Sequence, residues 1–194
     1  MRIHITGASC AGVTTLGHAL ASSLSLRHFD VDDFYWLPTN PPFTTKRAPE
    51  ERVALIQQRF GDDNWVLTGS CAEWGDALIK NADLIVFVAT PTSVRLERLA
   101  AREKQRYGNR LEPGGDVHQI HVAFKEWASR YDDPTFSGRN RARHALWLSK
   151  QTVPIVRVDG LSSAEKMAAD VIHALSQVAP WLATGKPPLR GNIR

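Results

Sequence analysis

The fold of this chain is decided by its first fifteen residues, Met1-Arg-Ile-His-Ile-Thr-Gly-Ala-Ser-Cys-Ala-Gly-Val-Thr-Thr15. Residues 2–6 are rich in β-branched side chains and predict a short strand. Gly7 and Gly12 then stand at the start and the end of a turn that leads into a helix. Glycine lets the backbone lie close to an anion, and the free N–H groups at a helix N-terminus attract negative charge. The spacing therefore predicts a phosphate-binding loop made of Gly7, Ala8, Ser9, Cys10, Ala11, Gly12, Val13, Thr14 and Thr15.

One position departs from the usual loop pattern G-x-x-x-x-G-K-[ST]. The lysine of that pattern reaches the β- and γ-phosphates, whereas this chain has Val13 there. Backbone amides still bind phosphate, but losing one donor from a catalytic site can cost on the order of 10²–10³-fold in rate. Either another cation replaces the lysine, or the loop binds a nucleotide without phosphoryl transfer.

The composition is that of a globular protein with one domain. The chain has 194 residues, of which 43% are hydrophobic and 23% are charged, enough for a sizeable core. With 24 Lys and Arg residues against 20 Asp and Glu residues, the chain is mildly basic, and its arginines are concentrated between Arg95 and Arg143. Small phosphorylated molecules explain this cluster as well as nucleic acid does.

The sequence also predicts where the protein acts. Two cysteines cannot build a disulfide framework, and Cys10 lies inside the predicted loop. The chain has no signal-peptide pattern, and no apolar run approaches the ~20 residues of a membrane span. We therefore expect a cytoplasmic protein with no membrane partner. Residues 179–194 are Pro- and Gly-rich and basic, and we expect a loosely held tail there.

Strand and helix patterns alternate along residues 1–178. Strands are predicted at 2–6, 27–31, 65–68, 84–88 and 154–158, and the continuous apolar run 84–88 suits the middle of a sheet. Helices are predicted at 13–26, 50–60, 91–107, 116–131 with Asp116 as cap, 140–150, and 162–178 with Ser162 as cap. Right-handed crossovers then give an α/β fold, a three-layer, doubly wound, five-stranded parallel sheet.

Acidic residues end the second strand, beside the predicted phosphate loop. Asp30, Asp32 and Asp33 lie where open α/β sheets bind ligands. A carboxylate there can accept the proton of an attacking hydroxyl or hold Mg²⁺, although any one of them could instead cap a turn or be solvated. The nearby Trp36 and Trp74 could line a pocket for a ring-shaped substrate or belong to the core.

Two sets of arginines flank a flexible segment. Arg95, Arg98, Arg102 and Arg106 share one helix face, and Arg130, Arg139, Arg141 and Arg143 follow a second break in the chain. Such stripes are often solvated, but two sets around a Gly-rich break can close over phosphates and replace water there. We expect residues 103–140 to form a lid and residues 38–62 to form an acceptor-binding region.

These motifs resemble those of the P-loop nucleotide and small-molecule kinases, the group of adenylate, cytidylate, uridine and shikimate kinases. Asp32-Asp33-Phe34-Tyr35 resembles the acidic-aromatic motif of uridine and nicotinamide riboside kinases, where an Asp is the proposed base. Asp30-x-Asp32 resembles the paired aspartates of shikimate kinases. Both comparisons select Asp32.

The resemblance extends to the arginines and the last strand. Arg98-Leu-Ala-Ala-Arg102 is similar to the pair that enters the lid of adenylate kinases, and Arg130-x-Asp132-Asp133-x7-Arg141 is similar to the motif that closes it. Val158-Asp159-Gly160 resembles the turn that flanks adenine. The chain is most similar to a bacterial adenylate kinase-related group, often called topology modulation proteins, which shares the Gly-Val-Thr-Thr loop.

The resemblance implies a kinase with ATP and Mg²⁺ as cofactors and a small acceptor, possible acceptors being a nucleotide or a nucleoside. The implied roles are catalysis for Asp32, Arg98, Arg102, Arg130 and Arg141; nucleotide binding for the loop and Gly160; metal binding for Thr14 and Asp32; and acceptor binding for Asp33, Tyr35 and Trp36. Two alternatives stay open: a non-catalytic nucleotide-binding regulator, because of Val13, and a DNA-associated protein, because of the basic tail.

Overall fold

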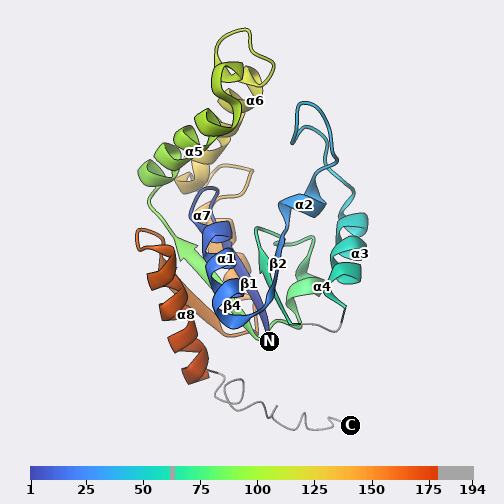
Figure 1. Cartoon of the computed structure of the whole chain (residues 1–194), viewed down its shortest axis with the longest axis vertical. Helices are drawn as coiled ribbons and strands as arrows, with labels where there is room; N and C mark the ends of the chain where they lie inside the picture. Colours follow the sequence, from blue (N-terminus) through green and yellow to red (C-terminus); the bar gives the residue numbers. More distant parts are fainter. Residues whose placement is uncertain (62–63, 179–194) are drawn as a thin grey trace.

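The computed structural model describes residues 1–61 and 64–178, and a sheet of five parallel strands lies at its centre (Figure 1). The strands are β1 (Arg2–Gly7), β2 (Arg27–Asp30), β3 (Trp65–Thr68), β4 (Leu84–Ala89) and β5 (Ile155–Asp159). Their order is β2-β3-β1-β4-β5, so β1 pairs with β3 on one side and with β4 on the other. The predicted five-stranded parallel sheet is confirmed.

Helices cover both faces of the sheet and give the three predicted layers. On one face lie α1 (Val13–Leu24) and α8 (Ala164–Val178), which enclose an apolar core with Ile3 and Ile5 of β1. On the other face lie α3 (Pro49–Phe60), α4 (Asp76–Ile79) and α7 (Arg141–Ser149), around Trp65 and Leu67 of β3. Side chains alternate between the two faces of a strand, so every strand of the middle of the sheet is buried on both sides.

Two segments extend beyond the carboxyl ends of the strands, one on each side of that end of the sheet (Figure 1). One consists of α5 (Thr92–Tyr107), the short helix η1 (Gly108–Leu111), α6 (His118–Ser129) and η2 (Arg130–Asp132), and it contains the segment predicted as a lid. The other consists of α2 (Asp32–Tyr35) and the loop after it, which is folded back by a bridge between Trp36 and Lys46.

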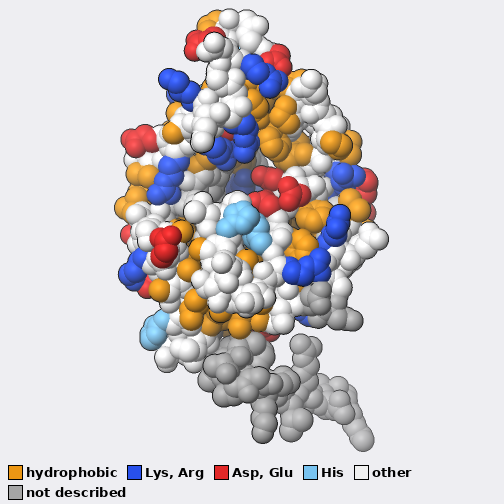
Figure 2. Space-filling model, in the orientation of Figure 1, with side chains coloured by type: hydrophobic (Ala, Val, Ile, Leu, Met, Phe, Trp, Pro, Cys, Tyr) orange, Lys and Arg blue, Asp and Glu red, His pale blue; other side chains and the backbone are white. Residues whose placement is uncertain are grey.

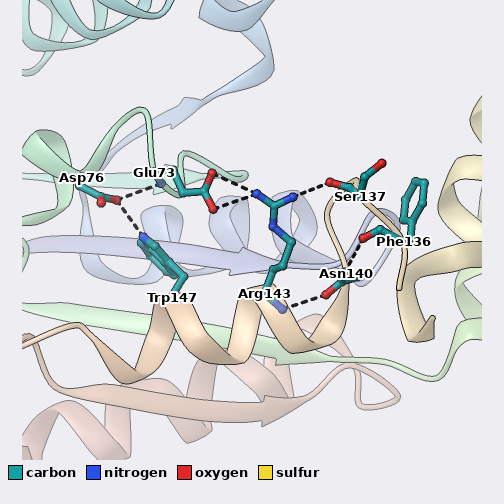
Figure 3. A network of polar contacts seen from close by, with 7 residues as sticks. All are labelled: Glu73, Asp76, Phe136, Ser137, Asn140, Arg143 and Trp147. Atoms are coloured by element: carbon teal, nitrogen blue, oxygen red, sulfur yellow. Dashed lines mark hydrogen bonds and ion pairs between the residues drawn. The ribbon is translucent and has the colours of Figure 1, made fainter. Parts of the chain in front are cut away.

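Polar contacts hold α7 where the chain returns from the lid segment to the sheet (Figure 3). The Asn140 side chain accepts a hydrogen bond from the Arg143 amide at 2.8 Å and so caps the helix. The Arg143 guanidinium donates to both carboxylate oxygens of Glu73, at 3.2 and 3.3 Å. Trp147 Nε1 donates to Asp76 Oδ1 at 2.8 Å. The end of the lid segment is therefore anchored to α4 and the residues before it.

Several predicted helix boundaries are wrong, for local reasons. The first helix ends at Leu24 because Ser25 adopts a left-handed conformation with φ of 53°. Asp116 caps no helix: it pairs with Arg110 at 2.6 Å, and α6 begins at His118. The last helix is capped by Ser163, whose Oγ accepts the Lys166 amide at 3.2 Å, and not by Ser162.

No helix in the described part of the chain is long and apolar enough to cross a membrane. The predicted basic tail, residues 179–194, lies outside the described residues.

Candidate active site

The predicted phosphate loop connects β1 to α1 with the expected glycine geometry. Gly12 begins the helix in a left-handed conformation with φ of 103°. A Cβ atom at Gly7 would lie 2.7 Å from the Val88 carbonyl oxygen, so only glycine fits there. The Leu16 amide donates to the Gly12 carbonyl at 3.0 Å. The preceding amides of the first turn are therefore free of helical bonds and available to an anion.

The carbonyl groups of the loop are held at its back. Ser9 O accepts a hydrogen bond from Arg95 Nη1 at 3.2 Å, and Ala11 O accepts one from Thr90 Oγ1 at 2.8 Å. Because C=O and N–H point in opposite directions across a planar trans peptide, the amides that follow these two carbonyls are directed to the other side. The loop thus presents N–H groups at its front, which is the arrangement that phosphate binding requires.

Gly160, predicted at the nucleotide site, lies against the loop. A Cβ atom there would lie 2.7 Å from Ala11 O and 1.9 Å from Thr90 Oγ1. Arg98 connects the two segments, because its Nη2 donates to Gly160 O at 2.8 Å and its Nη1 donates to Ala11 O at 3.4 Å. The fold therefore brings Gly160 next to the loop, and its role at a nucleotide site stays a prediction.

The acidic group adjoins the loop through Asp30. Thr14 Oγ1 donates to Asp30 Oδ2 at 2.8 Å, and the Asp32 amide donates to Asp30 Oδ1 at 3.0 Å. The sequence analysis assigned the metal to Thr14 and Asp32, whereas the residue in contact with Thr14 is Asp30. Carboxylate and hydroxyl oxygens suit Mg²⁺. Over residues 1–61 and 64–178, no three His, Cys, Asp or Glu side chains are grouped so that they could hold a metal ion.

Asp32 and Asp33 both open α2 with exposed side chains, yet their surroundings disfavour negative charge. Partial burial of the carboxyl group and the neighbouring Asp30 carboxylate raise the pKa of Asp32 above its ordinary value, while Arg139, a hydrogen bond from Trp36 and Arg102 lower it. The same two causes raise the pKa of Asp33. Carboxylates that repel one another in this way favour a cation or a proton between them.

The arginines predicted to be catalytic all have partners. Arg141 pairs with Asp132 at 2.6 Å, and Arg130 pairs with Asp133 at 3.0 Å, so the resembling motif forms two crossed ion pairs. Arg102 pairs with Glu103 at 3.0 Å and is close enough to Asp32 to lower its pKa. Arg98 alone of the four contacts the loop directly.

Arg139 belongs to the second arginine set, but the sequence analysis gave it no role of its own. Its guanidinium lies over the Trp127 ring, 5.2 Å from the centroid, and the residue is partly buried. Burial lowers the pKa of Arg139, whereas the Asp32 carboxylate raises it. Arg139 is therefore a cation that faces the predicted catalytic aspartate from the lid segment.

Tyr35, one of the predicted acceptor residues, contacts an arginine that the sequence analysis missed. Arg52 of α3 is only 5% exposed, and its guanidinium lies 3.8 Å from the centroid of Tyr35 and 5.1 Å from that of Trp74. Its Nε has no hydrogen-bond partner among the described residues, and no carboxylate there pairs with it. Trp36 packs edge-on against Tyr35, with a centroid distance of 4.8 Å. The acceptor region thus contains a buried cation in an aromatic environment.

The space-filling view shows how the two kinds of charge meet on this face (Figure 2). Acidic side chains gather at the edge of a hollow, and Lys and Arg side chains lie next to them, below the lid segment. Such a surface suits an anionic ligand that needs both a cationic clamp and a proton acceptor.

Comparisons with known proteins show the family to which the chain belongs. A family model described as AAA domain matches residues 3–119, more than half of the chain. The chain belongs to this family. The uncharacterized protein YqaC of Bacillus subtilis (strain 168) is 40% identical over 175 residues, which cover 90% of this chain and 97% of that protein.

Two kinases are also similar to it. A cytidylate kinase of Methanocorpusculum labreanum is 28% identical over 115 residues, which cover 53% of this chain and 63% of that protein. The crystal structure of the shikimate kinase of Aquifex aeolicus has the same fold, with a TM-score of 0.54 and 19% identity over 93% of this chain and 99% of that one. With the loop and the sheet, these matches show that the chain has a P-loop kinase fold.

In this P-loop kinase fold, the residue in the lysine position is partly buried and packs against the core. The Val13 side chain packs against the apolar cluster between the sheet and α1, and its Cγ2 would lie 3.0 Å from a Cβ at Gly7. Val13 carries no charge, so residue 13 cannot make the phosphate contact that lysine makes in the usual loop pattern.

Proposed function

We propose that this protein is a kinase that binds ATP with Mg²⁺ and transfers the γ-phosphoryl group to a hydroxyl of a small anionic acceptor. The observation that carries the proposal is the buried Arg52, whose Nε has no hydrogen-bond partner among the described residues and which stacks on Tyr35 of α2, the helix that Asp32 begins. A buried guanidinium without an anion is costly. A bound acceptor with a negative group would remove that cost.

The phosphate end of the site would use the loop. The amides of residues 10 and 12–15 would hold the phosphates, and Arg98 would lie beside the nucleotide because it contacts Ala11 and Gly160. Thr14, Asp30 and Asp32 have the oxygen ligands that suit Mg²⁺. When bound, the metal would offset the negative charge of the phosphate oxygens.

The proton would pass to Asp32. As the acceptor oxygen bonds to the γ-phosphorus, the bond from that phosphorus to the bridging oxygen of ADP breaks, and the acceptor's hydroxyl proton moves to the Asp32 carboxylate. Burial and Asp30 raise the pKa of Asp32. A base is more effective when its pKa is closer to the working pH.

The acceptor's negative group would bind at Arg52. Tyr35 and Trp74 hold the guanidinium by stacking and leave its edge for hydrogen bonds. The two kinases that the chain resembles are named for cytidylate and for shikimate, and each of those molecules carries an anionic group. Asp33 and Trp36 would then bind the uncharged part of the acceptor.

Lid closure would bring the remaining arginines to the transferring group. Arg130 and Arg141 are engaged by Asp133 and Asp132. They would have to exchange these surface ion pairs, each worth about 0–1 kcal/mol, for phosphate oxygens. Arg102 would contribute from α5.

Val13 favours a second candidate, a regulator that binds the nucleotide without transferring its phosphate. The two functions differ in turnover, so one experiment distinguishes them. We suggest ³¹P NMR of the protein with ATP and Mg²⁺ against separate pools of nucleoside monophosphates, nucleosides, hydroxy acids and uncharged polyols. A new phosphoester in an anionic pool supports the kinase. ATP binding with no product in any pool supports the regulator.

Arg52 can be tested once the reacting pool is known. Arg52→Ala should raise the KM for the acceptor about 10- to 100-fold, the size of a lost charged hydrogen bond, with little change in the KM for ATP. Arg59→Ala is the matched control, because Arg59 is an exposed arginine of the same helix. Equal KM values for the acceptor in both variants would contradict an anionic acceptor at Arg52.

A further inference from the structure

A second buried arginine lies behind the phosphate loop. Arg95 of α5 is 1% exposed. Its guanidinium donates to Ser9 O at 3.2 Å, to Thr90 O at 3.2 Å and to Thr92 Oγ1 at 2.6 Å, and it lies 4.8 Å from the centroid of the Tyr131 ring. All three acceptors are uncharged.

The charge of Arg95 has no ion-pair partner of its own. In the described part of the chain, no carboxylate pairs with it. The Thr92 hydroxyl, which accepts from Arg95, donates to Asp132 Oδ2 at 2.5 Å. However, Asp132 forms its ion pair with Arg141, at 2.6 Å. A buried guanidinium that is bonded only to neutral oxygens is electrostatically incomplete, and an anion near it would be stabilised.

The place where Arg95 acts is the loop itself. Because Arg95 holds the Ser9 carbonyl at the back, the planar peptide directs the Cys10 amide to the front. Cys10 has a φ of 61°, a left-handed conformation that bulky residues rarely adopt. The contact with Arg95 therefore orients one of the amides that would bind phosphate.

We propose that Arg95 takes over the role of the missing loop lysine: from behind the loop it supplies the positive charge that a lysine at position 13 would supply from the front, and it fixes the Ser9–Cys10 peptide. Arg95 is a positioning residue, because it acts through the loop and does not touch the phosphates. The inference rests on the proposed function only in that phosphates bind at this loop.

The test compares the wild type with Arg95→Met, Arg95→Lys, Val13→Lys and the Arg95→Met/Val13→Lys double variant. Isothermal titration calorimetry would measure the affinities for ATP, inorganic tripolyphosphate and adenosine. Arg95→Met should weaken the binding of tripolyphosphate and ATP about 10- to 100-fold and leave the binding of adenosine unchanged. Arg95→Lys, which keeps a positive charge, should lose less affinity than Arg95→Met. In the wild type, Val13→Lys should change the affinity for tripolyphosphate less than about 3-fold. In the Arg95→Met background, the same substitution should raise that affinity at least about 10-fold.

Three results would overturn the inference. The first is wild-type affinity for tripolyphosphate in Arg95→Met. The second is an equal loss of affinity for adenosine and tripolyphosphate, which would mean that Arg95 only maintains the fold. The third is an equal gain in tripolyphosphate affinity from Val13→Lys in the wild type and in Arg95→Met, because equal effects would mean that the two positions act independently.

A folding failure does not prevent the decision. If thermal unfolding shows that Arg95→Met is not folded, Val13→Lys in the wild type decides: a gain above about 30-fold in tripolyphosphate affinity means that the cation was still missing, and a gain below about 3-fold supports Arg95. A wild type that binds no tripolyphosphate overturns this inference and the proposed function together. Tripolyphosphate and ATP binding without phosphoryl transfer would contradict the proposed kinase activity but not the proposed role of Arg95.

Discussion

At the scale of single residues, Asp32 illustrates a conflict between stability and function. The pKa of Asp32 is raised in the folded protein, so the folded state binds a proton more tightly than the unfolded state does. The contribution of Asp32 to stability therefore falls as the pH rises from the unfolded pKa through the folded pKa. Above that window, the charged carboxylate destabilises the fold.

Asp32→Asn should consequently raise the free energy of unfolding at pH 7, and the gain should disappear below the unfolded pKa of an aspartate, near pH 4. The gain will be small, because the side chain is solvent-exposed. The same variant should lose about 10²–10⁴-fold in turnover, the usual contribution of a general base. Urea unfolding at pH 4 and pH 7, with steady-state kinetics at pH 7, measures both effects.

Glu97→Gln is the control for Asp32→Asn, because it removes an exposed carboxylate from α5, outside the acidic group. It should leave turnover and the pH dependence of stability unchanged. A stabilised Asp32→Asn variant with full turnover would show that Asp32 is strained but is not the base.

The sequence predicted Asp32 and the loop because their signals are local: glycines at fixed spacing, and carboxylates at the end of a strand. It could not predict the roles of Arg52, Arg95 and Arg139. Helical periodicity placed Arg95 on a charged stripe, whereas that side chain is 1% exposed. Whether such a stripe faces solvent or a neighbouring segment depends on tertiary contacts, here with Ser9 from the other end of the domain.

At the scale of secondary structure, the segment between α6 and α7 depends on Asn140. This side chain is 1% exposed, accepts the Arg143 amide at 2.8 Å and donates to Phe136 O at 2.7 Å (Figure 3). Asn140→Ala removes the cap and leaves the partly buried Phe136 carbonyl without this donor. Each loss costs about 1–2 kcal/mol, so we expect a destabilisation of about 2–4 kcal/mol in urea unfolding.

Asn140→Asp separates the two contributions, since it keeps the capping oxygen and loses the donor to Phe136. Its stability should lie between the wild type and Asn140→Ala. A loss below about 0.5 kcal/mol in Asn140→Ala would mean that α7 is held by its packing and by the Arg143 and Trp147 contacts alone.

Element types were easier to predict than element ends. All five strands and the long helices follow from hydrophobic periodicity, but α2 did not, since four residues are too few to show a helical period. Asp116 and Ser162 were plausible caps by residue type. In the structure, Asp116 pairs with Arg110, and Ser163 caps the last helix in place of Ser162. Both outcomes depend on the course of the chain between helices.

At the scale of the whole molecule, two buried histidines connect the sheet to α7 beneath the site. His4 of β1 is fully buried, and its Nδ1 lies 3.2 Å from Leu67 O. His144 of α7 lies between Thr6 and Tyr131, with its Nε2 3.2 Å from Thr6 Oγ1 and its Nδ1 3.1 Å from the Tyr131 hydroxyl. Both rings lie between β1 and α7, and in the described part of the chain no carboxylate forms an ion pair with either of them.

These histidines predict how acid unfolds the protein. Burial lowers the pKa of His4 to about 4 and that of His144 to about 3. Between the ordinary histidine pKa near 6.5 and these values, the unfolded chain binds two protons that the folded protein does not. Stability is therefore complete above about pH 7 and falls as the pH decreases, at a limiting slope of about 2.7 kcal/mol per pH unit for two groups.

The measurement is urea unfolding between pH 8 and pH 5, above the range where most carboxylates titrate. His144→Gln should lower stability at pH 8, because its ring contacts are lost, yet reduce the limiting slope below pH 6.5 by about 1.4 kcal/mol per pH unit, the share of one group. His173→Gln, an exposed histidine of α8, should keep the wild-type slope. A flat stability profile from pH 7 to pH 5 in the wild type would mean that the histidines are protonated in the fold. The lid segment would then have to admit water or an anion down to Thr6, directly behind the phosphate loop.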